Sequence, residues 1–180
     1  SKPASSKRVY LNFRGERIVG TALNSQDGVL VYRMRPFSID DKPDNISQSE
    51  ANVIAEVWKN VSEDFSAFNI DVTTERPPSF GPTTAHVLVM SRVDANGKVV
   101  ADENTGGFGY VDVWGTDYFV QYQPALVFSD NLSNNAKFIA EAVSHEFGHN
   151  LSLTHDGRTS PAEEYYRGHG SGNISWAPIM

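Results

Sequence analysis

The amino-acid sequence predicts an α+β fold in which helices pack on a mixed β-sheet. Short runs rich in β-branched residues accompany two longer segments whose apolar residues recur every three or four positions, which is the helical period. The chain has 180 residues, the usual size of one domain, and no cysteine. We therefore expect a single domain that is stabilised by packing, without disulfides or thiolate metal ligands.

Strands are expected where apolar and β-branched residues cluster between turn-forming segments. The first covers residues 7–13 and alternates apolar with polar side chains. A hairpin is expected from residues 17–21 and 29–33, around a turn at 24–28. The run at 85–90 is nearly all apolar, which is typical of a central strand covered on both faces. Further strands are expected at residues 70–74, 110–114 and 124–128.

Two helices are expected, and each begins at residues that favour N-terminal caps. Ser47 and Glu50 have the spacing of a capping box, and the apolar period continues to Phe65, which predicts a helix of about 16 to 20 residues. The second helix is expected to begin near residues 133–135 and to end around Leu151. Its expected core side consists of Phe138, Ile139, Ala142, Val143 and Phe147.

The charge and hydropathy of the chain argue against two classes of partner. The net charge is −7, the pI is near 5.1 and no basic patch stands out, so nucleic acid is not expected as a partner. No apolar run approaches the ~20 residues of a membrane span, and no signal peptide is recognisable. We expect a monomer without a membrane span.

Three loops contain residues that suggest a ligand site but favour an ordinary loop. Residues 40–45 are interpreted as a solvated acidic loop, and residues 94–98 with 102–104 as a surface turn, with calcium binding as the alternative in both. The glycines of residues 105–115 do not form a phosphate loop, because no Lys-Ser/Thr follows them. They are typical of a bulge or of close backbone approach. His86, at the start of a strand, is assigned a structural role.

The chemistry is concentrated in the stretch from His145 to His155, which holds three of the five histidines. On a helix, His145 and His149 lie one turn apart on the same face, where two imidazoles can bind one zinc ion. His155 would complete a three-ligand site with one open position, which is the arrangement of a catalytic zinc. Glu146 is then placed to act as a general base on a metal-bound water.

These residues resemble the extended zinc signature of the metzincin metallopeptidases, HExxHxxGxxH followed by a Met-turn. His145, Glu146, His149 and His155 match that pattern, and the stretch 177–180 resembles the Met-turn, whose methionine, here Met180, lies beneath the metal. The resemblance implies a metzincin-like α+β catalytic domain with a twisted mixed five-stranded sheet, two long helices and a small irregular C-terminal subdomain. The boundary would divide residues 1–152 from 153–180.

The same resemblance implies an activity and a location. The chain is expected to be a zinc metalloendopeptidase of the bacterial, Cys-free type, secreted or at the cell surface, with a protein or peptide substrate. The expected strand at 110–114 would line the cleft and pair with the substrate backbone. A non-catalytic zinc-binding or adhesion module on the same fold is the rival hypothesis.

Two departures from the family pattern keep alternatives open. Ser152 replaces the glycine that lets the backbone turn toward the third ligand, and a left-handed serine costs about 1 kcal/mol. If the turn fails, Glu163 or Glu164 is the alternative third ligand. The family also continues beyond Met180, so either residues are missing from the sequence or the chain lacks part of its specificity pocket.

Three further side chains lie near the expected third ligand without an assigned role. His169 is interpreted as an ordinary loop histidine, with substrate contact or zinc binding in a resting state as alternatives. Tyr165 and Tyr166 could supply a hydroxyl group to the oxyanion of the reaction, but the sequence does not fix the direction of either ring.

Overall fold

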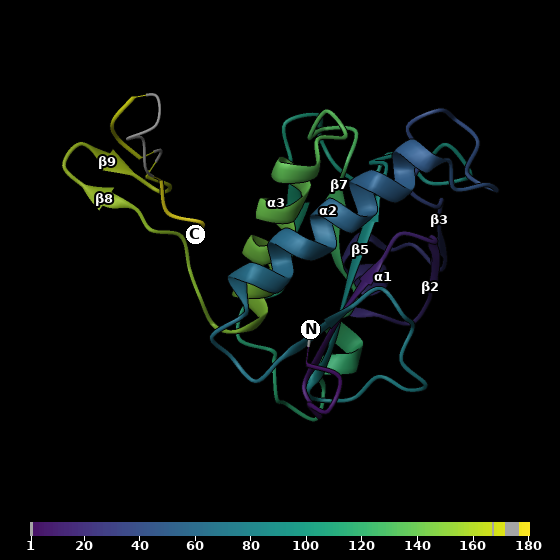
Figure 1. The fold of residues 1–180 in the computed structure, drawn as a ribbon, viewed down its shortest axis with the longest axis horizontal. Coiled ribbons are helices and arrows are strands. Elements are labelled where there is room, and N and C mark those ends of the chain that lie inside the picture. The colour runs from purple at the N-terminus through teal and green to yellow at the C-terminus, as the bar shows by residue number, and fades with distance from the viewer. Residues whose placement is uncertain (1, 167, 172–176) are drawn as a thin grey trace.

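A five-stranded mixed sheet forms the centre of the protein (Figure 1). The computed structural model describes residues 2–166, 168–171 and 177–180. In spatial order the strands are β4 (Asp71–Thr73), β1 (Arg8–Asn12), β5 (Thr84–Met90), β7 (Ala125–Phe128) and β6 (Gly107–Phe108). The first four are parallel, and the edge strand β6 runs antiparallel to β7. The predicted mixed five-stranded sheet is therefore confirmed.

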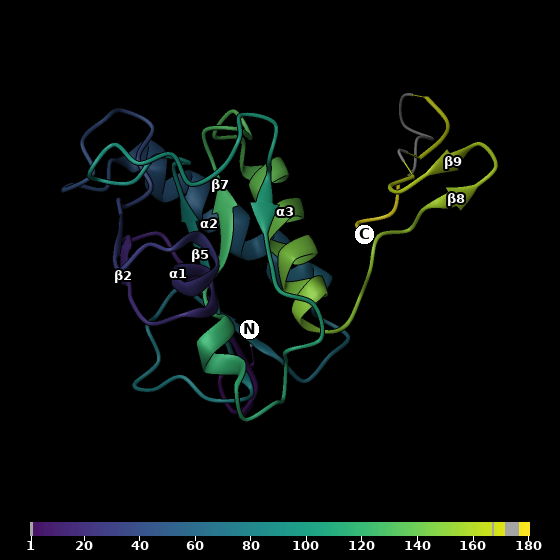
Figure 2. The ribbon, with the colours of Figure 1, turned by 180° about the vertical axis from the view of Figure 1, so that it is seen from behind.

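The two long helices cover one face of this sheet. In Figure 1, α2 (Gln48–Asp64) and α3 (Ala136–Asn150) lie side by side in front of the strands. Behind the sheet lie the short helix α1 (Ala22–Asp27) and the antiparallel pair β2 (Glu16–Ile18) and β3 (Tyr32–Met34), which Figure 2 shows from the back. The protein thus has three layers, with the sheet in the middle.

Alternation along the central strand β5 divides the core into two halves. Val87 and Val89 point to the helices, whereas Leu88 and Met90 point to the layer that contains α1 and β3. Successive side chains of a strand face opposite sides, and here both sides are buried. This explains why the sequence of β5 is almost entirely apolar.

The capping box predicted at the start of α2 is present, and its carboxylate does more than cap the helix. Glu50 is buried, and its Oε2 accepts from the Ser47 N–H at 2.7 Å while its Oε1 accepts from the Ile39 N–H at 2.8 Å and the Ser38 hydroxyl at 3.0 Å. The backbone donors, Ser47 first, outweigh desolvation and lower the pKa of Glu50 to about 2. One carboxylate therefore fastens the preceding loop to the first turn of α2.

The prediction of a turn at residues 24–28 is wrong, although the predicted pair of strands around it is confirmed. The connection is helix α1, capped by a reciprocal Thr21–Asn24 box and closed by Gly28 in the left-handed conformation. The Asn24 amide also donates to the carbonyls of Ile18 and Val29 on either side of the helix. A helix of this length is too short to show a period in the sequence.

The strand expected at residues 110–114 is also wrong, because the sheet edge lies earlier, at β6. After Phe108 the chain leaves the sheet and caps α3: the N–H groups of Asp112 and Trp114 donate to the carbonyls of His149 and Asn150. The last carbonyls of a helix need such external donors. Asp112 adopts a φ of 61°, which is incompatible with a regular strand.

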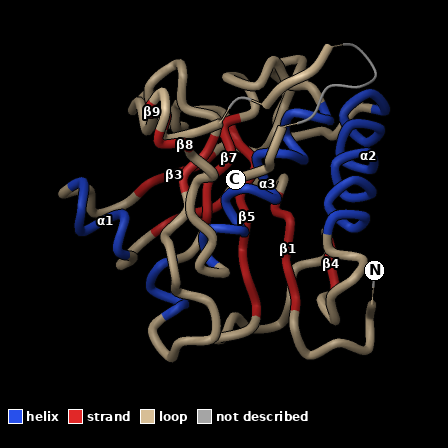
Figure 3. The backbone as a smooth tube through the Cα atoms, turned by 90° about the vertical axis from the view of Figure 1, so that its left-hand side faces the viewer, coloured by secondary structure: helices blue, strands red, loops and turns tan. Residues whose placement is uncertain are grey.

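Beyond these elements the chain forms short, exposed structures. The loop after β6 contains the 3₁₀-helix η1 (Phe119–Tyr122), and a small hairpin of β8 (Arg158–Thr159) and β9 (Ala162–Glu163) follows α3. This hairpin stands away from the sheet in Figures 1 and 2, and the described C-terminal residues return toward α3 in Figure 3. Among the described residues, no helix has the length and apolarity needed to cross a membrane.

We predict that Glu50→Gln lowers the free energy of unfolding at pH 7 by about 1–3 kcal/mol, because an amide NH₂ would face buried donors. The folded-state pKa lies below the ordinary value of 4.5, so the carboxylate stabilises the fold above that pH and the stabilisation is lost as the pH falls toward 2. The free energy of unfolding, measured in urea at pH 7 and at pH 3, should therefore differ less between the two pH values in the variant than in the parent protein. Glu56→Gln, at an exposed position of the same helix, is the matched control, and an equal loss there would contradict the prediction.

Candidate metal centre

Helix α3 positions the first two histidines of the cluster. Its N-terminus is capped by the Asn135 side chain, and Val143 and Phe147 bury its inner side in the core. His145 and His149 therefore emerge on an adjacent face, with their ring centroids 4.6 Å apart. The helix thus fixes two imidazoles one turn apart, as the motif predicts.

The turn that brings back the third histidine begins at Ser152, which has a φ of 76°. The Ser152 N–H donates to the carbonyl of His149, and the Leu153 N–H donates to that of Gly148, both at 3.0 Å, which is the hydrogen-bond pattern of a Schellman C-cap. The Ser152 hydroxyl also donates to Asp112 Oδ1. Serine therefore adopts the left-handed conformation expected of the family's glycine, and it adds a bond that glycine lacks.

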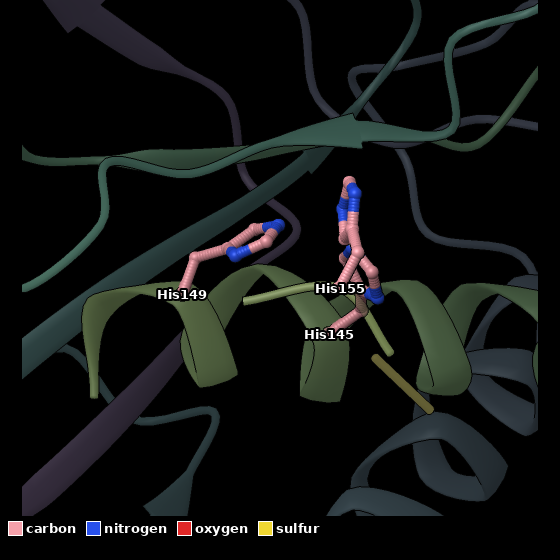
Figure 4. A group of neighbouring side chains, drawn as sticks. All are labelled: His145, His149 and His155. Atoms are coloured by element: carbon pink, nitrogen blue, oxygen red, sulfur yellow. The ribbon is translucent and has the colours of Figure 1, made fainter. Parts of the chain in front are cut away.

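The three imidazoles converge on one point (Figure 4). One ring nitrogen from each of His145, His149 and His155 lies within 4.8 Å of the other two, and Nε2 of His145 is 3.2 Å from Nε2 of His155. Two nitrogens bound to a tetrahedral zinc at about 2.0–2.1 Å would be roughly 3.3 Å apart. The geometry of the cluster therefore fits a zinc ion.

Backbone carbonyls fix the tautomers of the two helical histidines. Nδ1 of His145 is hydrogen-bonded to the carbonyl of Ile179, and Nδ1 of His149 to that of Leu153 at 2.9 Å. A carbonyl can only accept, so each Nδ1 carries the proton and each Nε2 keeps its lone pair for a metal. Burial lowers the pKa of His145 against the opposing effect of the Ile179 carbonyl, which favours the neutral ring that metal binding needs.

Glu146 lies beneath the edge strand β6 and is only 6% exposed. A Cβ atom at Gly107 would lie 2.5 Å from Glu146 Oε1, and one at Gly109 would lie 2.6 Å from the Glu146 carbonyl. The close backbone approach that the glycine-rich stretch predicts is therefore confirmed, and Glu146 is the residue approached. Its burial raises the pKa of the carboxyl group to about 8.

A cleft of about 1030 Å³ contains the cluster and Glu146. Helix α3 and strand β6 form one side, and Glu164, Tyr165 and residues 177–179 form the other. Phe138 lines this cleft and is 48% exposed, so its assignment to the core is wrong. It lies one turn before Ala142 on the cleft side of the helix, where the sequence period does not distinguish a cleft wall from core.

The glutamates proposed as an alternative third ligand do not join the cluster. Glu163 is paired with Arg158 at 2.9 Å, and Glu164 Oε1 lies 3.7 Å from Nδ1 of His155. Within the described part of the chain, the three histidines are the one group of three or more potential ligands that could hold a metal. The acidic segments at 40–45 and 94–104 supply no such group, so calcium is not supported.

The remaining candidates lie around the cleft or away from it. The Tyr165 ring packs against the rings of His155 and His145, with centroids 5.5 and 5.9 Å away, and its hydroxyl donates to the carbonyl of Pro178 at 3.3 Å. The Tyr166 hydroxyl instead bonds Nδ1 of His169 at 2.8 Å. His86 is buried, and the Asn12 amide is 3.0 Å from its Nε2. Tyr165 therefore contacts the histidine cluster directly.

Met180 is buried and lies against α3. Its Sδ would be only 2.7 Å from a Cβ placed at Gly148, the residue that precedes the second histidine. The segment 177–180 thus passes close to α3 next to the cluster, while Trp176 lies outside the described residues.

The mixed sheet and the cluster of two histidines from α3 with His155 from the following segment define a metzincin-like zinc metallopeptidase domain. The chain matches the model of the reprolysin-like metallopeptidases of family M12B over residues 39–156, more than half of its length, and it belongs to that family. The search of curated proteins found no match. A solved structure of myroilysin has 18% sequence identity to this chain and a TM-score of 0.36. The match covers 58% of this chain and 43% of the myroilysin chain. The assignment does not depend on that likeness.

We predict that Gly107→Ala lowers the free energy of unfolding by about 1–3 kcal/mol, because the new methyl group would collide with the Glu146 side chain and the Leu126 carbonyl. The neighbouring Gly106→Ala is the matched control, since its Cβ would meet only Leu132 Cδ2, at 3.4 Å. Urea unfolding of the two variants tests the difference. Equal stability of both would show that β6 does not approach Glu146 as closely as the structure indicates.

Proposed function

We propose that the chain is a zinc-dependent endopeptidase, with His145, His149 and His155 as metal ligands and Glu146 as general base. The observation that supports this most directly is the convergence of the three imidazoles, with the lone pairs of His145 and His149 facing the shared space. Three neutral protein ligands leave one coordination position open, as in catalytic zinc sites. Family membership supports peptide-bond hydrolysis as the reaction.

In this proposal the protein's own groups position the substrate and transfer the protons. The bound zinc would supply a Lewis acid that polarises the scissile carbonyl and acidifies water. Glu146 accepts the proton of the attacking water and later donates it to the leaving amine. The ionised carboxylate that accepts the proton would be favoured by the bound cation, and burial beneath β6, which raises the pKa of Glu146, favours the protonated form between the two steps.

The substrate backbone binds along the edge of the sheet. Within the residues that the structure describes, strand β6 pairs with β7 on one side only, so its other edge is available to an extended peptide, which would add as a further strand. Residues 107–108 thus take the role that sequence analysis gives to 110–114. Residues 1–152 and 153–180 would be the two subdomains on either side of the cleft.

The compartment and the assembly state belong to the same proposal. We place the protein outside the cell or at its surface, as a monomer of the bacterial Cys-free type. Membership of a peptidase family supports the location, and the lack of cysteine supports only the Cys-free type. Fractionation of the native source, with detection of the protein in the medium or on intact cells, tests the location.

Glu146→Ala is expected to retain one zinc per chain and to lower kcat/KM by about 10²–10⁴-fold, because the base is lost and the ligands are kept. Cleavage of a peptide library and metal analysis of the same preparations are the two measurements. Glu75→Ala removes an exposed carboxylate outside the cleft and is the control. A Glu146 variant as fast as the parent excludes this base, and a zinc-loaded parent that cleaves no peptide favours the non-catalytic zinc-binding module.

The third ligand is tested by comparing His155→Ala with Glu164→Ala and Glu163→Ala. We expect His155→Ala to weaken zinc affinity by more than the roughly 10–100-fold that is typical when a group outside the ligand set is changed. In both glutamate variants, the loss of zinc affinity relative to the parent protein should be no larger than about that range. Competition against a chromogenic chelator measures all three affinities. The opposite ranking would transfer the third position to a glutamate.

A further inference from the structure

A row of aromatic rings leads away from the cleft on the loop that follows β6. Phe108 lines the cleft, and its ring packs edge-to-face on Tyr110 with centroids 4.9 Å apart. Tyr110 packs in the same way on Tyr122 at 4.9 Å, and Tyr122 packs on Tyr118 at 5.7 Å. The four rings are therefore in continuous contact from the cleft to the surface.

The three tyrosines form the wall of a second depression, which we call the tyrosine groove: Tyr110, Val111, Asp112, Val113, Tyr118 and Tyr122. Its volume is about 380 Å³, which is within the ~300–1,000 Å³ of ligand-binding pockets. Tyr118 is 49% exposed and Val111 is 47% exposed. Large apolar side chains gathered at the surface in this way are typical of an interaction site.

The loop that forms the groove is fixed by buried contacts on its inner side. Phe119 is fully buried and packs edge-to-face on Trp114, and the Gln123 amide donates to the carbonyl of Thr84 at 3.0 Å. The Tyr110 hydroxyl donates to Gln26 Oε1 of α1 at 3.1 Å. A surface that is already ordered loses little conformational entropy when a partner binds.

The groove and the cleft follow each other along the chain. Gly109 lines the cleft and the next residue, Tyr110, lines the groove. In Figure 2 the chain continues from the strand beside α3 down to the short helix η1. One end of a peptide aligned along β6 would therefore lie close to the groove.

We propose that the tyrosine groove is an exosite for the continuation of the same polypeptide substrate, beyond the residues held in the cleft. Grooves lined by aromatic rings bind extended segments that carry proline, because the flat rings pack against the pyrrolidine ring. The expected occupant is thus an extended segment with proline or aromatic side chains. This assignment rests on the proposed peptidase function for the direction of the bound chain.

The test measures binding and does not depend on turnover. Two short peptide hydroxamates serve as metal-anchored probes, one with the hydroxamate at its C-terminus and one at its N-terminus. Each is also made with an extension of about six residues, roughly 20 Å of chain, that contains alternating prolines and a tryptophan. Fluorescence anisotropy gives the Kd of all four probes for the zinc-loaded protein.

We expect one of the two extensions to lower Kd by about tenfold, the effect typical of a well-filled apolar pocket. Tyr118→Ser should reduce that gain to less than about twofold. Leu30→Ser makes the same kind of change at an exposed residue outside the groove and should keep the full gain. If neither extension improves binding, or if the gain survives Tyr118→Ser, the exosite is excluded.

Three further outcomes distinguish the polypeptide exosite from a glycan site and from the proposed peptidase function. If a free proline decapeptide displaces the extended probe to the level of the short one, the polypeptide assignment is supported. If chitohexaose does so and the decapeptide does not, the groove is a glycan site and the assignment is overturned. A gain that depends on Tyr118, in a protein that cleaves no peptide, would retain the exosite and refute the peptidase function alone.

Discussion

The left-handed turn at Ser152 is the constraint on which the candidate site depends. It follows Asn150, the last residue of α3, and the cap residue Leu151, so that the chain reverses there and His155 faces the two histidines of the helix. The cost of a positive φ in serine is offset by two backbone bonds and by the bond to Asp112. Asp112 belongs to the loop that caps α3, and it also lines the tyrosine groove. The turn at Ser152 therefore contacts the end of the helix and the proposed exosite, and it also positions the third histidine of the metal cluster.

Helix α3 can position catalytic groups because each of its sides makes contacts with a different part of the protein. The inner side is buried in the core through Val143 and Phe147, which fixes the axis of the helix. The side under β6 carries Glu146, and two glycines of the edge strand allow the backbone to pass directly over it. The N-terminal part of the helix contributes Phe138 to the cleft wall. A site on a rigid, well-anchored helix retains its geometry better than one on loops.

Sequence reasoning succeeded where a local pattern determines the structure. The capping residues and the helical period locate α2 and α3, and the spacing of His145, Glu146 and His149 fixes their common helix. It failed where tertiary contacts decide between similar patterns. Residues 110–114 alternate as a strand would, yet their donors satisfy the end of α3, and Phe138 has the period of the core while it faces a cleft. The resemblance to the Met-turn places residues 177–180 near the metal, but the sequence does not predict the hydrogen bond between the Ile179 carbonyl and Nδ1 of His145.

That last contact shows that the site requires both sides of the cleft. The Ile179 carbonyl holds the proton of His145 on Nδ1, and thereby leaves Nε2 free toward His155. The Tyr165 hydroxyl donates to the neighbouring carbonyl of Pro178. The segment after His155 therefore helps to hold Ile179, whose carbonyl orients His145. Met180 packs directly on Gly148, where a Cβ atom would lie 2.7 Å from its Sδ. The glycine inside the HEFGH motif therefore allows the close approach of a residue more than thirty positions further along the chain.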